Sequence, residues 1–183
     1  PGEPPRIAAD EQARLMRSVR LHIFKMLEIE KQRLDVNIDI RRSLYDRARR
    51  LSARGAISAA ELEMNRFLNA QADQLLSLKN VLTAQQWIIL VAGNIETNTV
   101  PEAIRPPAAN RPANLLTAQQ RLDTAIVAQT VALVALADQR VAYRSAEMDR
   151  ARRLQRGGAI TDEEVSNITL NLSRSRYQRS ILL

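Results

Sequence analysis

Two sets of three residues share one spacing, and their side chains are equipped for binding and for holding a turn. In each set an arginine is followed four residues later by a leucine, and seven residues after that by a hydroxyl residue: Arg47, Leu51 and Ser58, then Arg150, Leu154 and Thr161. A guanidinium forms charge-assisted hydrogen bonds, a leucine makes apolar contacts, and a hydroxyl donates and accepts hydrogen bonds. Neither set contains an acid–base pair suited to catalysis.

The rest of the sequence offers no better starting point for catalysis or metal binding. His22 is the single histidine, and there is no cysteine to complete a metal site with it. The sequence contains no glycine-rich phosphate loop and no HExxH zinc motif. We therefore predict that the protein is not an enzyme, has no catalytic residue, and uses no metal or cofactor.

Each hydroxyl residue lies just after a glycine that should end a long helix. A glycine past the last turn stops a helix, and Ser or Thr followed three residues later by Glu forms a capping box that starts the next one. A helix, a short break and a second helix are typical of an αα-hairpin tip. The capping pairs are Ser58 with Glu61 and Thr161 with Glu164, and the turn residues are Gly55, Ile57, Gly157, Gly158 and Ile160.

Long runs without Pro or Gly predict four long helices. Apolar residues in these runs recur at separations of three, four and seven, which is typical of coiled coils. The expected fold class is all-α, with two tandem antiparallel coiled-coil helical hairpins joined by a Pro-rich linker. The expected parts are a loose segment at 1–9, a first hairpin at 10–92 with its tip at 55–57, a linker at 93–112, and a second hairpin at 113–183 with its tip at 157–160, truncated at its C-terminus.

The first helix has the longest apolar stripe. Asp10 is its expected N-cap, and the polar residues Glu30, Asn37 and Arg41 are expected to interrupt the seam. The predicted seam residues of this helix are Val19, Ile23, Leu27, Leu34, Leu44, Ala48 and Leu51. Those of the last helix are Val165, Ile168, Leu172 and Ile181.

The two tips are copies of one another. Residues 46–61 read DRARRLSARGAISAAE and residues 149–164 read DRARRLQRGGAITDEE, so ten of sixteen positions are identical at an offset of 103. The helices that lead into the tips have similar expected lengths, which indicates that a whole hairpin is repeated. The same surface is therefore predicted to occur twice in one chain.

The spacing Arg-x3-Leu-x6-Ser, set in Arg-Gly-Ala-Ile-Ser and Gly-Gly-Ala-Ile-Thr, resembles the hairpin tip of bacterial membrane fusion proteins. These are the periplasmic adaptor subunits of HlyD-like secretion systems and multidrug efflux pumps. The resemblance covers about residues 10–92 and 113–183, and it implies that the two three-residue sets dock onto a TolC-like outer-membrane channel. It also implies a periplasmic location, an inner-membrane anchor, and an inner-membrane transporter bound through parts outside this fragment.

The sequence departs from that family in two ways. It has two hairpins and no recognisable lipoyl or β-barrel sequence, whereas typical adaptors have one hairpin among such domains. Thr161 replaces Ser in the second tip and keeps the hydroxyl. With two hairpins per chain, a homotrimer would present six, which would match the pseudo-sixfold opening of such a channel.

The basic charge of the chain leaves other partners open. The formal net charge is +7, and six arginines lie in each of the segments 41–54 and 140–156. This charge would steer an acidic protein, or it forms a solvated helix face. The alternatives are a basic coiled-coil module that binds nucleic acid or anionic membrane, a helical scaffold, and tips that are structural turns only. Because the charge gathers at hairpin ends and no nucleic-acid motif is present, we expect no nucleic-acid partner.

Overall fold

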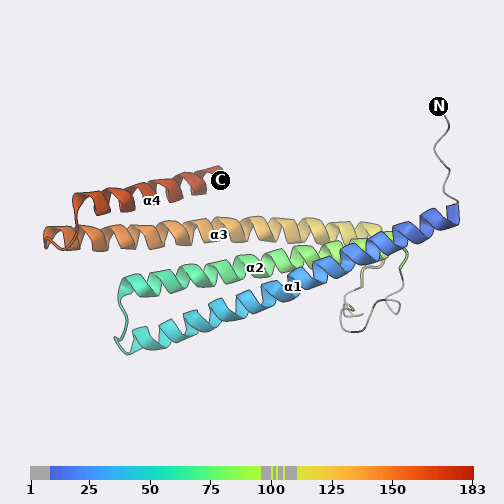
Figure 1. Cartoon of the computed structure of the whole chain (residues 1–183), viewed down its shortest axis with the longest axis horizontal. Coiled ribbons are helices and arrows are strands. Elements are labelled where there is room, and N and C mark those ends of the chain that lie inside the picture. The colour runs from blue at the N-terminus through green and yellow to red at the C-terminus, as the bar shows by residue number, and fades with distance from the viewer. Residues whose placement is uncertain (1–8, 96–99, 101, 103–104, 106–110) are drawn as a thin grey trace. The chain divides into compact units, whose positions relative to one another are not determined.

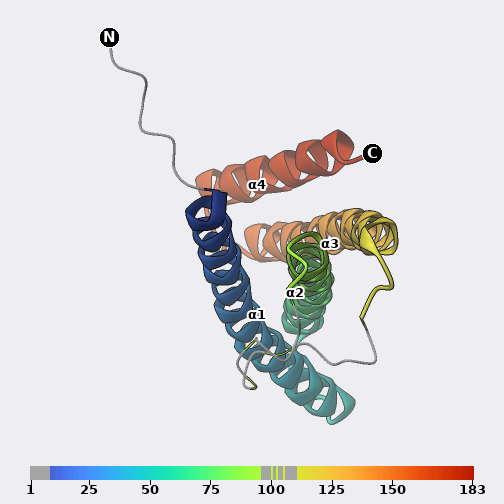
Figure 2. The same cartoon turned by 90° about the vertical axis from the view of Figure 1, so that its right-hand side faces the viewer.

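The computed structural model describes residues 9–95, 100, 102, 105 and 111–183, and no strand occurs among them. The four helices of this part of the chain are α1 (Ala9–Ala53), α2 (Ala59–Ala92), α3 (Leu115–Arg156) and α4 (Asp162–Ile181) (Figures 1 and 2). The all-α prediction is confirmed. Helix α1 already begins at Ala9, which was expected to be loose, and Asp10 lies inside its first turn and is not the N-cap. The other residues expected to be loose, 1–8, lie outside the described residues.

Contacts divide the chain into two compact units, and each is described by itself. Unit 1 consists of Pro1–Arg33 and Lys79–Ala125, and unit 2 consists of Leu34–Leu78 and Ile126–Leu183. Each unit holds one end of α1, α2 and α3, while both turns and all of α4 belong to unit 2. The division into one domain per hairpin stays a prediction.

The core of unit 1 is built from α1, α2 and the segment after α2. Phe24, Trp87 and Leu90 are buried there together with Ile95 and Val100. Asn94, two residues after the end of α2, has a φ of 48°. The Ile95 amide donates to the Leu90 carbonyl oxygen at 2.9 Å. The segment expected to act only as a linker therefore contributes two core residues, each worth about 1.5–3 kcal/mol when fully buried.

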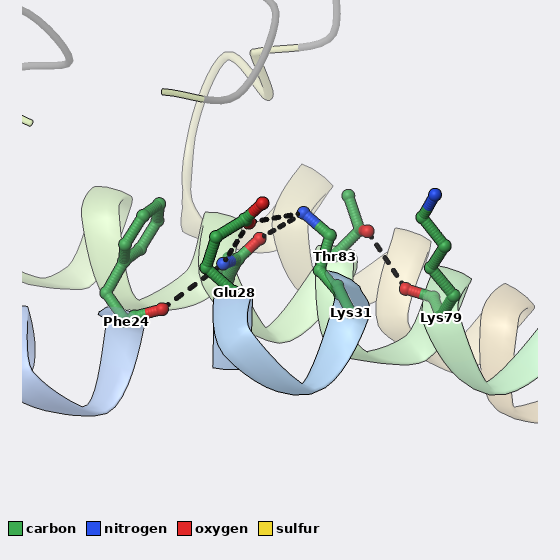
Figure 3. A network of polar contacts seen from close by, with 6 residues as sticks. Phe24, Glu28, Lys31, Lys79 and Thr83 are labelled. Atoms are coloured by element: carbon green, nitrogen blue, oxygen red, sulfur yellow. Dashed lines mark hydrogen bonds and ion pairs between the residues drawn. The ribbon is translucent and has the colours of Figure 1, made fainter. Parts of the chain in front are cut away.

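A buried polar network also lies in unit 1 (Figure 3). The fully buried Gln86 amide donates to the Phe24 carbonyl oxygen at 3.3 Å and to Glu28 Oε2 at 3.1 Å. Lys31 Nζ donates to Gln86 Oε1 at 2.9 Å and pairs with Glu28 Oε2 at 2.8 Å. Sliding α1 along α2 would leave these groups buried without partners, so the network fixes the register of the two helices.

The seam of α1 is only partly the predicted one. Leu34 and Ala48 are buried and Leu27 and Leu51 are half-buried, as expected. The prediction was wrong for three residues, which remain 44–52% exposed: Val19, Ile23 and Leu44. Phe24 and Ile38 are buried in their place. On α4, Leu172 is buried as expected, but Ile181 is 65% exposed, so its assignment to the inner face was wrong.

In unit 2, contacts between neighbouring helices agree with two antiparallel hairpins. Arg41 Nε of α1 donates to Gln71 Oε1 of α2 at 3.1 Å, and Arg42 pairs with Asp73 at 3.4 Å. A second group of contacts joins α3 to α4, and it includes the bond from Arg140 to Gln178 and the ion pair of Arg179 with Asp138.

Helices α2 and α3 also contact each other in unit 2. The rings of Phe67 and Tyr143 stack with centroids 6.1 Å apart and planes 10° apart. The Arg140 guanidinium lies 5.6 Å from the Phe67 ring centroid, and the Arg144 guanidinium lies 5.2 Å from that of Tyr143. Stacked rings and cations over ring faces attract one another, so this aromatic lock (Phe67, Tyr143, Arg140 and Arg144) holds the α1–α2 pair against the α3–α4 pair.

Helices α2 and α3 are long and apolar enough to cross a membrane by length and composition alone. Neither contains about 18 consecutive apolar residues, because the apolar stretches are interrupted by polar side chains. The core helix of a soluble protein passes the same test, so length and composition do not show whether either helix lies in a membrane.

Candidate functional site

The first tip is a helix stop with two specific hydrogen bonds. Gly55 has a φ of +67°, and its amide donates to the Ser52 carbonyl oxygen at 2.9 Å. The Ala56 amide donates to the Leu51 carbonyl oxygen, also at 2.9 Å. These bonds form a Schellman motif, which satisfies carbonyl groups that the end of a helix leaves unpaired.

The second tip has the same geometry at the same offset. Gly158 has a φ of +71°, and its amide donates to the Gln155 carbonyl oxygen at 2.9 Å. The Ala159 amide donates to the Leu154 carbonyl oxygen at 2.9 Å. Gly158 is therefore the counterpart of Gly55, while the preceding Gly157 does not have a positive φ.

Both predicted capping boxes are confirmed. The Glu61 amide donates to Ser58 Oγ at 3.2 Å, and the Ser58 amide donates back to Glu61 Oε2 at 2.7 Å. The Glu164 amide donates to Thr161 Oγ1 at 3.2 Å, and the Thr161 amide donates to Glu164 Oε2 at 2.8 Å. The exchange of Ser for Thr thus leaves the local structure unchanged.

The two hydroxyl groups are already engaged inside their own tips. Ser58 Oγ donates to Glu61 Oε2 at 2.7 Å, and Thr161 Oγ1 donates to Glu164 Oε2 at 3.0 Å. A hydroxyl has one hydrogen to donate, so in this structure only an acceptor lone pair is left for a partner. The first role of Ser58 and Thr161 is therefore to shape the tip.

The capping carboxylates are held in their charged form. Hydrogen bonds from the backbone and then the side chain of Ser58 lower the pKa of Glu61 below its ordinary value of 4.5, and nearby Arg150 lowers it further. Bonds from the backbone and side chain of Thr161 lower the pKa of Glu164 in the same way. Since Arg150 belongs to the second tip, the two tips lie close enough to interact electrostatically.

The structure places all six predicted docking residues in unit 2, but it does not make them equivalent. Arg47 and Arg150 are exposed, and Arg47 forms no ion pair with any residue in the described part of the chain. Leu51 is half-buried, whereas Leu154 is 38% exposed. The turn residues Ile57 and Ile160 are both half-buried.

Part of the charge pattern follows from the helices themselves. Arg50 lies in the last turn of α1, Arg153 and Arg156 lie in the last turn of α3, and the first turn of α4 contains Asp162, Glu163 and Glu164. Cations near C-termini and anions near N-termini stabilise helices through the macrodipole. The arginines therefore do not by themselves identify an acidic partner.

The aromatic lock was not anticipated from the sequence. Tyr143 follows Leu136 by seven residues, which marks it as a contact residue. Phe67 lies one position before Leu68, which is followed by Leu75, Leu82 and Ile89 at steps of seven, so the same pattern favours Leu68 over Phe67. Periodicity identifies a packed face without naming the helix that it meets. Among the residues with described positions, no group of three or more His, Cys, Asp or Glu side chains is arranged to hold a metal ion.

Comparison with known proteins gives no relative: no protein-family model, no curated protein and no solved structure matches this chain.

Proposed function

We propose that this chain is the hairpin region of a periplasmic adaptor that bridges an inner-membrane transporter to a TolC-like outer-membrane channel. The observation that carries the proposal is the duplicated tip: the same helix stop and the same capping box occur twice in unit 2. Each copy presents an exposed arginine next to a leucine. The resemblance of this pattern to adaptor tips supplies the identity of the partner.

The rigidity of the tips supports a docking role. Each turn is closed by two backbone bonds on one side and a reciprocal capping box on the other, so little conformational entropy is lost when a partner binds. A flexible surface loop would not present an arginine and a leucine at a fixed separation. The tips also lie on long helices, which are suited to spanning a distance between two membranes.

Self-association is a second part of the proposal, and α1 supports it. In unit 1, this helix leaves six large apolar side chains 45–60% exposed: Leu15, Met16, Val19, Ile23, Met26 and Ile29. From Met16 onward the successive separations are three or four, and Leu15 lies four residues before Val19, so these side chains lie on one face, as in the seam of a coiled coil. An apolar patch of this kind marks a protein contact, here a neighbouring copy of the chain in a homotrimer.

Nucleic-acid binding has less support. The tip segments 46–61 and 149–164 contain no aromatic residue on which a base could stack. Their carboxylates lie beside the arginines, because the first turns of α2 and α4 contain Glu61 and Glu164. Both features disfavour a surface that follows a phosphate backbone.

The proposal is tested by affinity purification of the protein from its own cell envelope, with co-purified proteins quantified by mass spectrometry. The variant replaces both tip leucines, Leu51→Ser with Leu154→Ser, and the control replaces the exposed Leu170 of α4 with Ser. We expect an outer-membrane channel to co-purify with the natural protein and the control, and to fall about tenfold with the variant. An unchanged channel signal, or recovery of nucleic-acid-binding proteins in its place, contradicts the proposal.

A further inference from the structure

The aromatic lock sets the relative height of the two tips within unit 2. Phe67 lies eight residues after the start of α2 at Ala59, and Tyr143 lies thirteen residues before the end of α3 at Arg156. At 1.5 Å per residue, the stacked pair is about 12 Å from the tip end of α2 but about 20 Å from the tip end of α3. The second tip therefore projects about 8 Å further than the first.

Other contacts of unit 2 give the same direction of offset. Arg140, which lies over the Phe67 ring, is three residues further from the end of α3 than Tyr143. Ala70 of α2 and Asp138 of α3 line the same groove, and the stretch of helix from there to the tip end is longer on α3. Figure 1 shows the end of α3 extending beyond the turn between α1 and α2.

Leu154 of the second tip is 38% exposed, so its side chain is available to a partner. Arg152 and Arg153 beside Leu154 are exposed and form no ion pair with any described residue. Arg150 of the second tip is among the groups that lower the pKa of Glu61 in the first tip, so the two tips are neighbours.

We infer that the two tips are not interchangeable, and that the second tip makes the leading contact with the partner through Leu154. The chemistry that fits this contact is a protein pocket that is apolar at its base, to receive the leucine, and edged by a carboxylate, to pair with Arg152, which is not one of the arginines of the last turn of α3. The first tip projects less far and makes fewer contacts with the same partner. This inference rests on the proposed docking function and assigns the two repeats different roles in it.

Single variants at matched positions test the inference. Leu154→Ser and Leu51→Ser are each introduced into the natural protein, and the co-purified outer-membrane channel is quantified. We expect Leu154→Ser to lower the channel signal about tenfold and Leu51→Ser to lower it less than threefold. Far-ultraviolet circular dichroism of both purified variants shows that the helices are retained.

Exchanging the two tip segments shows whether the projection of a tip or its amino-acid sequence determines how strongly it contacts the partner. The segments 46–61 and 149–164 have equal lengths, so each can replace the other in the chain. We expect the projection of the tip to matter more than its sequence. Leu154→Ser should therefore still lower the channel signal more than Leu51→Ser after the exchange. Equal losses at both positions, or a larger loss at position 51, overturn the inference, whereas no loss in the double variant overturns the docking function itself.

Discussion

Ser58 and Thr161 illustrate how a motif residue can determine the shape of a surface through contacts within its own turn. Each hydroxyl accepts from one amide and donates to the capping carboxylate of the same tip. Loss of such an N-cap costs about 1 kcal/mol and frays the first turn of the helix. The requirement for a hydroxyl at these positions therefore follows from the shape of the turn, while the arginine and leucine of each set remain available for contact.

The glycines of the tips give the first prediction. Gly55→Ala and Gly158→Ala should each lower the free energy of unfolding by about 1–2 kcal/mol, because a side chain at positive φ is strained even where space is open. Gly157→Ala is the matched control. Its φ is not positive, and an added Cβ would lie 3.5 Å from the Leu154 carbonyl oxygen, an ordinary contact.

Urea unfolding followed by circular dichroism measures all three glycine variants. Gly157→Ala should be neutral or slightly stabilising, because it reduces the entropy of the unfolded chain. Equal destabilisation at positions 157 and 158 would contradict the assignment of the helix stop to Gly158.

The capping carboxylates give a prediction about pH. A lowered pKa in the folded state means that Glu61 and Glu164 contribute their full stability above the ordinary glutamate value of 4.5 and lose it as the pH falls through the lowered value. Carbon-13 NMR titration of the two side-chain carboxyl groups measures both values directly.

Arg150→Gln distinguishes the two carboxylates. It should raise the pKa of Glu61, since Arg150 lies near it, and leave the pKa of Glu164 unchanged. An unchanged pKa of Glu61 would show that the second tip does not approach the first as described.

Helix α1 presents two apolar stripes, and one of them packs against other residues of the described part of the chain. Phe24, Leu34 and Ile38 face the core, while Val19 and Ile23 face outward. With the half-buried Leu27 included, the inner stripe has separations of three, seven and four, and the outer stripe has similar ones, so the sequence pattern alone cannot assign one of them to the inner seam. The outward stripe is the part of the molecule that self-association would bury.

The outward stripe gives a prediction at the scale of one helix. Ile23→Glu should shift the protein toward the monomer in sedimentation equilibrium, because a charge in an apolar seam is costly when it is buried without a partner. Gln32→Glu introduces the same side chain at an exposed polar position of α1 and should leave the mass unchanged. The same mass for both variants and the natural protein would argue against this face as the contact.

The aromatic lock gives a prediction for a pair of helices. A double-mutant cycle with Phe67→Ala and Tyr143→Ala should give a coupling energy of about 0.5–1.5 kcal/mol in urea unfolding, as expected for stacked rings. The control cycle combines Phe67→Ala with Tyr177→Ala, since Tyr177 is on α4 and is 68% exposed. A coupling energy near zero in the first cycle would remove the basis for the offset between the tips.

At the scale of the whole molecule, the sequence predicted local features well and tertiary partners poorly. Glycines at the turns and Ser/Thr–Glu pairs after them act within a few residues, so the helix ends and both capping boxes could be located from composition and spacing. Which stripe of α1 is buried, and which ring Tyr143 meets, depend on residues far away in the chain. For the same reason Ile95 and Val100 were assigned to a linker, although they complete the core around Phe24.

The most direct test of the docking function is photo-crosslinking in living cells. A photoreactive residue replaces Ala56 in one strain and Ala159 in another, because both are exposed beside the caps and their side chains form no hydrogen bond that the substitution would remove. We predict that an outer-membrane channel is captured from both positions and more efficiently from position 159. Capture of cytosolic or nucleic-acid-binding proteins, with no channel from either position, would contradict the adaptor function and leave only the helical fold.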